Sequence, residues 1–177
     1  MLLRPYIAAD IPKHAEAVRQ SLDALMAELP FAVPGWTEED SARHVAWARA
    51  AWDEGADRSF AVTDGRTGAF LGEASLSEPD RKASRVNLAW WTRSGVTGLG
   101  IATSAGRLVA RHALGDLGFN RVEVLVAVEN RGSQRVAEKI GARREGVLRE
   151  RILLRGIARD AVIYSLLLRD VAPPIRM

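Results

Sequence analysis

Residues 90–108, "WWTRSGVTGLGIATSAGRL", connect an apolar run to a helix-like pattern through a turn that holds three of its four glycines. Glycine lets a backbone adopt positive φ angles and approach a ligand closely, and the start of a helix offers free N–H groups. An apolar strand followed by such a turn and an amphipathic helix therefore predicts a phosphate-binding turn in an α/β domain. The surrounding residues must indicate which ligand it takes.

Two common phosphate-binding turns match this stretch poorly. A P-loop needs a lysine and a Ser or Thr directly after its second glycine, but Ile101 and Ala102 follow Gly100. A dinucleotide fingerprint needs a third glycine where this chain has Thr103, and it opens a repeating βαβ array that is missing here. A third kind of phosphate-bearing ligand is therefore favoured.

Composition narrows the class of protein. The 177 residues are 47% apolar and 27% charged, which predicts a single globular domain over residues 1–177. There is no cysteine, so disulfides, thiolate catalysis and thiolate metal sites are excluded. With three histidines and no His-x-x-x-His pair, no metal site is expected.

Charge and hydropathy give little support to a nucleic-acid partner or a membrane span. Lys and Arg number 25 against 22 acidic residues, a net charge of +3, and the arginines are scattered. A nucleic-acid partner is therefore not expected, because such proteins usually carry a basic stripe with interleaved aromatics. The apolar runs are too short to cross a bilayer, and residues 1–10 do not read as a signal peptide, so a cytoplasmic location is expected.

Hydrophobic periodicity predicts the order β-αα-ββ-β-α-β-α-ββ, an α/β (α+β) domain with a mixed, mainly antiparallel sheet flanked by helices. The expected elements are a strand near residues 2–7, helices at 11–29 and 37–54, a hairpin at 59–76, a strand at 84–91, a helix from 101, a strand at 121–128, a helix at 130–141 and two strands at 143–168.

The glycine turn resembles motif A of the GNAT superfamily of N-acetyltransferases, written Q/R-x-x-G-x-G/A. The residues on its six places are Thr97, Gly98, Leu99, Gly100, Ile101 and Ala102. A second motif of this superfamily, N-x-x-S followed by a glycine and then E-G, is matched in order and spacing by Asn130, Ser133, Gly141, Glu145 and Gly146. One predicted helix and one predicted strand separate the two motifs, as in the superfamily.

The resemblance covers essentially the whole chain and is strongest to the branch of ribosomal-protein N-terminal (Rim-type) acetyltransferases. It implies a GNAT fold that transfers an acetyl group from acetyl-CoA directly to a primary amine, either a protein N-terminus or a small molecule, in a ternary complex. It also implies a set of cofactor-binding residues: Trp91 or Thr92 for the thioester oxygen, the turn Thr97–Thr103, Asn130 and Ser133. Arg93 is a further candidate for the cofactor phosphates, with a solvated surface charge as the alternative. Ser133 would also assist the departing sulfur, although a helix-capping role is the alternative for both Asn130 and Ser133.

The chain departs from the branch at three places. Thr97 replaces Gln or Arg, Ala142 replaces a phenylalanine, and Ile152 stands where the branch has a glutamate proposed as general base. Glu73, on a predicted strand, is therefore the first candidate for the base, with an exposed-face carboxylate as the alternative. Glu123 and Asp160 are weaker candidates.

The acceptor is expected between the first two helices and the segment of residues 29–40. Phe31 and Trp36 are the candidate lining residues, and packing between the helices is the alternative role for each. Arg131 and Arg135 could also reach cofactor phosphates. Other functions stay open: transfer of a longer acyl group such as succinyl, or a CoA-binding module without catalysis. A homodimer is compatible with the sequence.

Overall fold

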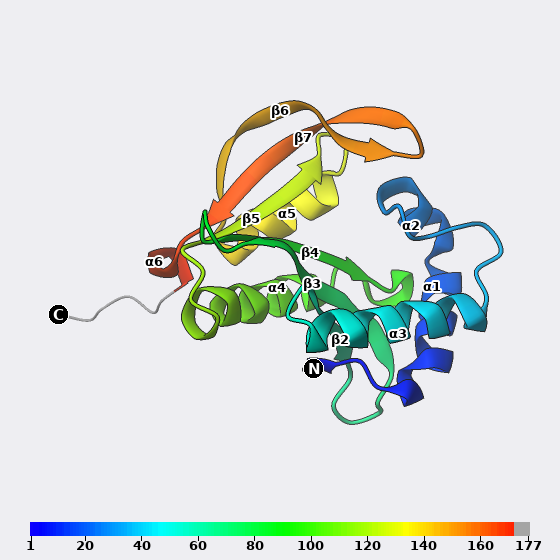
Figure 1. The fold of residues 1–177 in the computed structure, drawn as a ribbon. Helices are drawn as coiled ribbons and strands as arrows, with labels where there is room; N and C mark the ends of the chain where they lie inside the picture. The colour runs from blue at the N-terminus through cyan, green and yellow to red at the C-terminus, as the bar shows by residue number, and fades with distance from the viewer. Residues whose placement is uncertain (172–177) are drawn as a thin grey trace.

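The structure, a computed structural model, describes residues 1–171, so the last six residues of the predicted domain lie outside it. Figure 1 shows a twisted sheet with helices on both of its faces. The strands are β1 (Leu2–Pro5), β2 (Arg58–Thr63), β3 (Phe70–Asp80), β4 (Arg85–Thr92), β5 (Arg121–Ala127), β6 (Arg143–Leu154) and β7 (Ile157–Leu166). The α-helices are α1 (Ile11–Gln20), α2 (Leu22–Glu28), α3 (Glu38–Asp53), α4 (Ile101–Arg111), α5 (Arg131–Ile140) and α6 (Leu168–Val171).

The seven strands form one sheet in the order β1-β2-β3-β4-β5-β7-β6. Only the pairing between β4 and β5 is parallel; the others are antiparallel. This confirms the predicted fold class and the predicted order of strands and helices. Within residues 1–171, no helix combines the length and the apolar character needed to span a bilayer.

The main difference from the predicted elements is a break in the first helix at Ser21, which divides it into α1 and α2. Ser21 leaves the helical region with φ −114° and ψ 9°. Its hydroxyl accepts a hydrogen bond of 2.9 Å from the Ser94 N–H, just beyond β4. The second long helix begins as expected, because the Thr37 hydroxyl accepts from the Asp40 N–H in a capping box.

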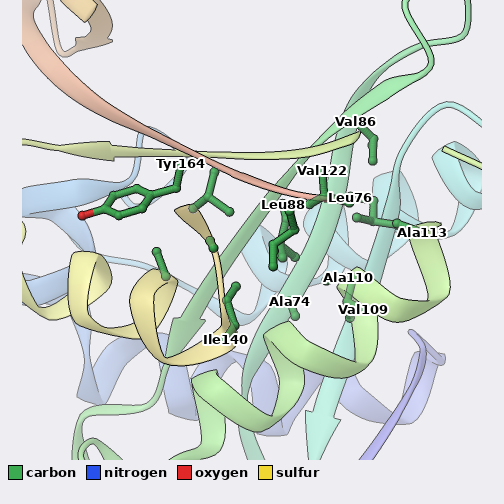
Figure 2. Close-up of a cluster of buried hydrophobic side chains, with 14 of the residues drawn as sticks. Ala74, Leu76, Val86, Leu88, Val109, Ala110, Ala113, Val122, Ile140 and Tyr164 are labelled. Atoms are coloured by element: carbon green, nitrogen blue, oxygen red, sulfur yellow. The ribbon is translucent and has the colours of Figure 1, made fainter. Parts of the chain in front are cut away.

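Two hydrophobic clusters hold the sheet between its helices. On one face, residues of α4 and α5 such as Val109 and Ile140 pack on Leu88 and Val122 of the sheet, as Figure 2 shows. On the other face, α1, α2 and α3 cover Phe70 and the Trp91 side chain. Neighbouring residues on a strand point to opposite faces, so Trp90 packs in the first cluster while Trp91 lies in the second.

The turn between β6 and β7 contacts the end of α2, as can be followed in Figure 1. Arg155, with φ 50° in this turn, donates hydrogen bonds to the carbonyl oxygens of Met26, Leu29 and Ala32. These carbonyls lie at and after the C-terminal end of α2, where a helix leaves its last oxygens unpaired. The sheet edge and α2 are thereby joined above the space between β4 and β5.

Candidate active site

The central feature is a gap in the sheet between β4 and β5. Their parallel pairing covers only Arg85–Asn87 against Arg121–Glu123, after which the two strands separate. A cavity of about 560 Å³ fills the space beyond and is lined by α2, the second half of β4, the glycine turn, β5, α5 and the β6–β7 hairpin. It contains most of the predicted cofactor-binding residues: Trp91, Thr92, Thr97, Gly98, Gly100, Ile101, Ala102, Thr103, Asn130 and Ser133.

The glycine turn, which lines this cavity except at Leu99, holds a row of free backbone N–H donors. Gly98 and Gly100 have φ angles of 78° and 79°, in the left-handed region that favours glycine. The first backbone bond of α4 runs from the Ser104 N–H to the Gly100 oxygen, at 2.9 Å. Among the described residues, the N–H groups of residues 98–103 have no hydrogen-bond acceptor. Such donors at a helix N-terminus suit a pyrophosphate, so the residues present fit coenzyme A.

The side chains around the turn do not all face the cavity. Leu99 is 73% exposed and is not part of the lining. The Thr97 hydroxyl donates to the Ser94 oxygen at 3.1 Å, so it closes the preceding turn where Gln or Arg is usual. Arg93 is bound to α1, through an ion pair with Glu16 at 2.6 Å and a bond to Gln20, and it does not line the cavity.

A different arginine stands beside the cofactor cavity. Arg135 of α5 lines it, whereas Arg131 donates to Gln134 on its own helix at 3.4 Å. Sequence reasoning treated these two and Arg93 as equivalent, because spacing alone does not tell which face of the helix an arginine occupies. The structure leaves Arg135 as the arginine best placed to meet a phosphate.

Asn130 and Ser133 have separate roles at the start of α5. The Asn130 side chain accepts a hydrogen bond of 2.9 Å from the backbone N–H of Ser133, so Asn130 is the N-cap. The Ser133 hydroxyl takes no part in capping, and Ser133 lines the cavity. Of the two alternatives for Ser133, the structure therefore leaves its side chain free for a ligand.

The strand register decides which N–H near the end of β4 faces the gap. The Arg93 N–H donates to the Leu71 oxygen at 2.9 Å. Bonded pairs alternate in an antiparallel ladder, so Glu73 and Trp91, two residues further along, are also a bonded pair. The Trp91 N–H therefore points to β3, and the Thr92 N–H points to the opposite side, toward the gap beside β5.

The weaker candidates for the base are engaged in structural contacts. Glu123 forms ion pairs with Arg85 at 3.1 Å and Arg121 at 2.8 Å. Asp160 accepts the N–H of Glu150 at 2.9 Å, within the irregular part of β6. At the position of the branch's glutamate, the apolar Ile152 lines the cofactor cavity.

A second cavity, also of about 560 Å³, lies on the α3 face of the sheet and brings together the two residues predicted to line the acceptor site and the residue predicted as the base. Phe31, Trp36 and Glu73 all line it. Glu73 is 8% exposed, so the alternative of an exposed-face carboxylate is wrong, and it lines this second cavity and not the one in the gap. The remaining lining residues are mostly polar or charged, with one valine and one tryptophan among them: Val33, Asp40, Arg43, His44, Trp47, Asp57, Ser59, Ser75 and Ser77.

Glu73 is the centre of a buried polar cluster that sequence reasoning missed. Its Oε2 accepts hydrogen bonds from the Tyr6 hydroxyl at 2.5 Å and from His44 Nε2 at 2.8 Å. Burial alone would raise the pKa of Glu73, but these bonds, above all that from His44, hold this pKa below its usual value. Burial raises the pKa of Tyr6 well above its usual value, and the adjacent Glu73 carboxylate adds to this. The pair is therefore a neutral phenol and a carboxylate.

His14 completes this cluster from α1. Its ring stacks on that of His44 with centroids 4.8 Å apart and planes 8° apart. Its Nδ1 lies 3.0 Å from the Ser41 hydroxyl, which also accepts from Trp36 Nε1 at 2.8 Å. Burial, followed by the neighbouring His44, lowers the pKa of His14 from 6.5 to about 4, so this histidine is neutral at pH 7.

His14, His44 and Glu73 each place a ligand-type atom within 4.8 Å of the others, so metal binding has to be considered. A ring nitrogen directs its lone pair in the plane of the ring. The two imidazole planes are stacked and almost parallel, so their lone pairs run side by side instead of converging on one point. His44 Nε2 is also occupied by Glu73. The geometry suits a cluster that positions a proton better than a metal centre.

Comparison with known proteins places these features in a family. Residues 1–143 match the family model described as an acetyltransferase (GNAT) domain. The chain belongs to the GNAT acetyltransferases. This agrees with the resemblance seen in the two sequence motifs, which lie at the glycine turn and at the start of α5.

Individual GNAT proteins resemble this chain over different lengths. YdaF of Bacillus subtilis, whose name proposes a ribosomal N-acetyltransferase, is 35% identical over 103 residues, which are 58% of this chain and 56% of that protein. This chain therefore spans little more than half of that relative. A crystal structure of a probable acetyltransferase is 27% identical, covers 94% of this chain and 92% of its own, and has a TM-score of 0.85.

A further GNAT structure shows likeness of fold. The microcin C7 self-immunity acetyltransferase MccE, solved in complex with acetyl-CoA and AMP, has a TM-score of 0.84. It is 20% identical to this chain and covers 93% of it and 91% of the other chain. At this identity the likeness concerns the sheet and its helices.

Proposed function

We propose that this protein transfers the acetyl group of acetyl-CoA to a primary amine by direct attack in a ternary complex. The observation that carries the proposal is the row of free N–H groups at residues 98–103, at the mouth of the gap between β4 and β5. Membership of the GNAT family and the acetyl-CoA complex of MccE support it. The ribosomal name of YdaF makes a protein N-terminus one candidate acceptor.

In this proposal the cofactor lies along the first cavity. The N–H groups of Gly98–Thr103 bind its pyrophosphate, with Arg135 beside them. The pantetheine arm lies between β4 and β5, and the Thr92 N–H donates to the thioester oxygen, which polarises the carbonyl carbon. The Ser133 hydroxyl donates a hydrogen bond to the sulfur as the C–S bond breaks.

The acceptor amine enters through the second cavity. Carboxylates of Asp40, Asp57 and Glu73 in its lining attract an ammonium group, and Phe31 and Trp36 offer aromatic faces that also favour cations. Phe31, which lines the second cavity, packs near Trp91, which lines the first; their ring centroids lie 6.5 Å apart, and we propose that the amine reaches the thioester past these two rings. An amine in the second cavity can thus approach a thioester held at Thr92. We also propose a cytoplasmic location, and a homodimer is compatible with this function.

The test is a panel of amines and peptides incubated with acetyl-CoA, in which released CoA thiol and acetylated product are both measured. Titration calorimetry with acetyl-CoA and succinyl-CoA is run on the same protein. We expect saturable acetyl-CoA binding and CoA release with at least one amine. Tighter binding and faster turnover of succinyl-CoA would favour the longer-acyl alternative, and binding without turnover across the panel would favour a CoA-binding module.

A further inference from the structure

His44 has one ring nitrogen that is fixed and one that is open to the acceptor cavity. The Glu73 carboxylate can only accept hydrogen bonds, so the 2.8 Å contact with His44 requires a proton on Nε2 of His44. In neutral His44 the lone pair is then on Nδ1. Among the described residues, Nδ1 of His44 has no hydrogen-bond partner. It is also not among the fully buried unpaired atoms, so it is accessible. His44 itself lines the acceptor cavity.

The surroundings of His44 favour this tautomer and tolerate a positive charge on the ring. The Tyr6 hydroxyl donates to the same Glu73 oxygen at 2.5 Å, which keeps the carboxylate ionised and in place. Glu73 lies behind Nε2, so it stabilises an imidazolium, as a carboxylate does in a His–Asp dyad. On α1, the stacked His14 is neutral at pH 7, so it places no positive charge beside the His44 ring.

We infer that His44 is the general base that deprotonates the acceptor ammonium, and that Glu73 is its positioning residue. This inference rests on the proposed acetyl transfer. Glu73 then does not act as a direct base. Its Oε2 already accepts hydrogen bonds from Tyr6 and His44, which hold the carboxylate in place.

The proton balance of the step is complete. The ammonium gives one proton to His44 Nδ1, and the neutral amine attacks the thioester carbon. The C–N bond forms, the C–S bond breaks, and the electron pair leaves on sulfur. The second proton of the attacking nitrogen passes to the thiolate, and the proton on His44 is later released to water. The products are an amide and free CoA thiol.

The titratable and charged groups that face His44 come from several elements. Tyr6 follows β1, His14 is on α1, Glu73 is on β3, and the cavity lining adds three more charged residues: Asp40, Arg43 and Asp57. Burial raises the pKa of Asp57. Any pH profile therefore has to be compared with variants that change His44 and Glu73 alone.

The first experiment is nitrogen-15 NMR of the imidazole rings of the intact protein, which has only three histidines. We expect neutral His44 of the wild type to be the Nε2–H tautomer, with an unprotonated Nδ1. An Nδ1–H tautomer in the wild type would overturn the inference. This measurement needs no acceptor and does not depend on whether a variant folds.

The second experiment measures CoA release with a mixture of tripeptides that covers every N-terminal residue. We expect His44→Gln to lower kcat/KM by about a hundredfold or more and to remove the ascending limb of the pH profile, while acetyl-CoA affinity is unchanged. The matched control is His112→Gln, whose histidine pairs with Asp116 at 2.7 Å, outside both cavities, and it should keep the wild-type profile.

Added imidazole should restore part of the activity of His44→Ala, which a merely structural role would not allow. Wild-type rates in His44→Gln would overturn the assignment of the base while leaving acetyl transfer intact. No CoA release by the wild type would instead count against the proposed function, and the tautomer found by NMR would then show whether the dyad itself exists.

Discussion

Glu73 and Trp91 are hydrogen-bonded partners across β3 and β4, and their side chains lie on the same face of the sheet. Trp91 lines the cofactor cavity, Glu73 lines the acceptor cavity, and Thr92 is the next residue on β4. A bonded antiparallel pair has Cα atoms about 5.5 Å apart. The backbone of Glu73, which orients His44, therefore lies about one strand spacing from that of Trp91, the residue before the Thr92 N–H that we assign to the thioester oxygen.

Gly98→Glu should weaken acetyl-CoA binding by at least about tenfold, roughly 1.4 kcal/mol. Glutamate places a negative charge at the free N–H groups and forces an L side chain to adopt φ 78°. Titration calorimetry is the measurement, with Gly65→Glu as the control, because Gly65 has a negative φ and open space around it. Unchanged affinity in Gly98→Glu would contradict the placement of the pyrophosphate.

Ser133→Ala and Asn130→Ala should separate chemistry from helix capping. Ser133→Ala keeps the backbone N–H that Asn130 binds, so we expect a lower kcat with an unchanged Tm. Asn130→Ala removes the cap and should lower the free energy of unfolding by about 1 kcal/mol. Equal losses of stability in both variants would show that the Ser133 hydroxyl has a structural role.

His14 should make the protein less stable as the pH falls from about 6.5 to about 4. In this range the unfolded chain binds a proton at His14 while the folded protein, whose His14 pKa is about 4, does not. The unfolded state is thereby favoured by up to about 3 kcal/mol. Urea unfolding at several pH values would show this slope, and His14→Gln should lack it while His112→Gln keeps it. The same slope in His14→Gln would refute this explanation.

Arg155→Ala should loosen the wall that α2 and the β6–β7 turn form around the cofactor cavity. It removes donors to the carbonyl oxygens of Leu29 and Ala32, among others, and we expect a loss of about 1–2 kcal/mol. Hydrogen exchange should become faster in α2, and the KM for acetyl-CoA should rise. Arg151→Ala is the control, because Arg151 is exposed and makes only a 4.0 Å contact with Glu78. Equal effects of Arg155→Ala and Arg151→Ala would contradict the role of the Arg155 hydrogen bonds in joining α2 to the β6–β7 turn.

The order of the elements followed from the sequence, and most residues predicted to bind the cofactor line the first cavity, because strand patterns, glycines and capping residues are local signals. Their contact with the cofactor stays a prediction. The break at Ser21 was missed, since the apolar spacing continues through it and the stabilising contact comes from Ser94, far along the chain. Arg93 was assigned to the phosphates because it adjoins the turn, but its partner Glu16 lies on another helix.

The polar cluster on the acceptor side was only partly predictable. Glu73 was chosen as a candidate base from its strand position, and Phe31 and Tyr6 lie in segments whose packing depends on the tertiary fold. His14 and His44 stand thirty positions apart on two helices, and no local spacing brings them together.

The most direct test of the account is incubation of the protein with acetyl-CoA and an acceptor panel, with CoA thiol and acetylated amine quantified together. The account predicts saturable acetyl-CoA binding and one CoA released for each amide formed, with binding at least about tenfold weaker in Gly98→Glu. No binding of acetyl-CoA at millimolar concentration would contradict it.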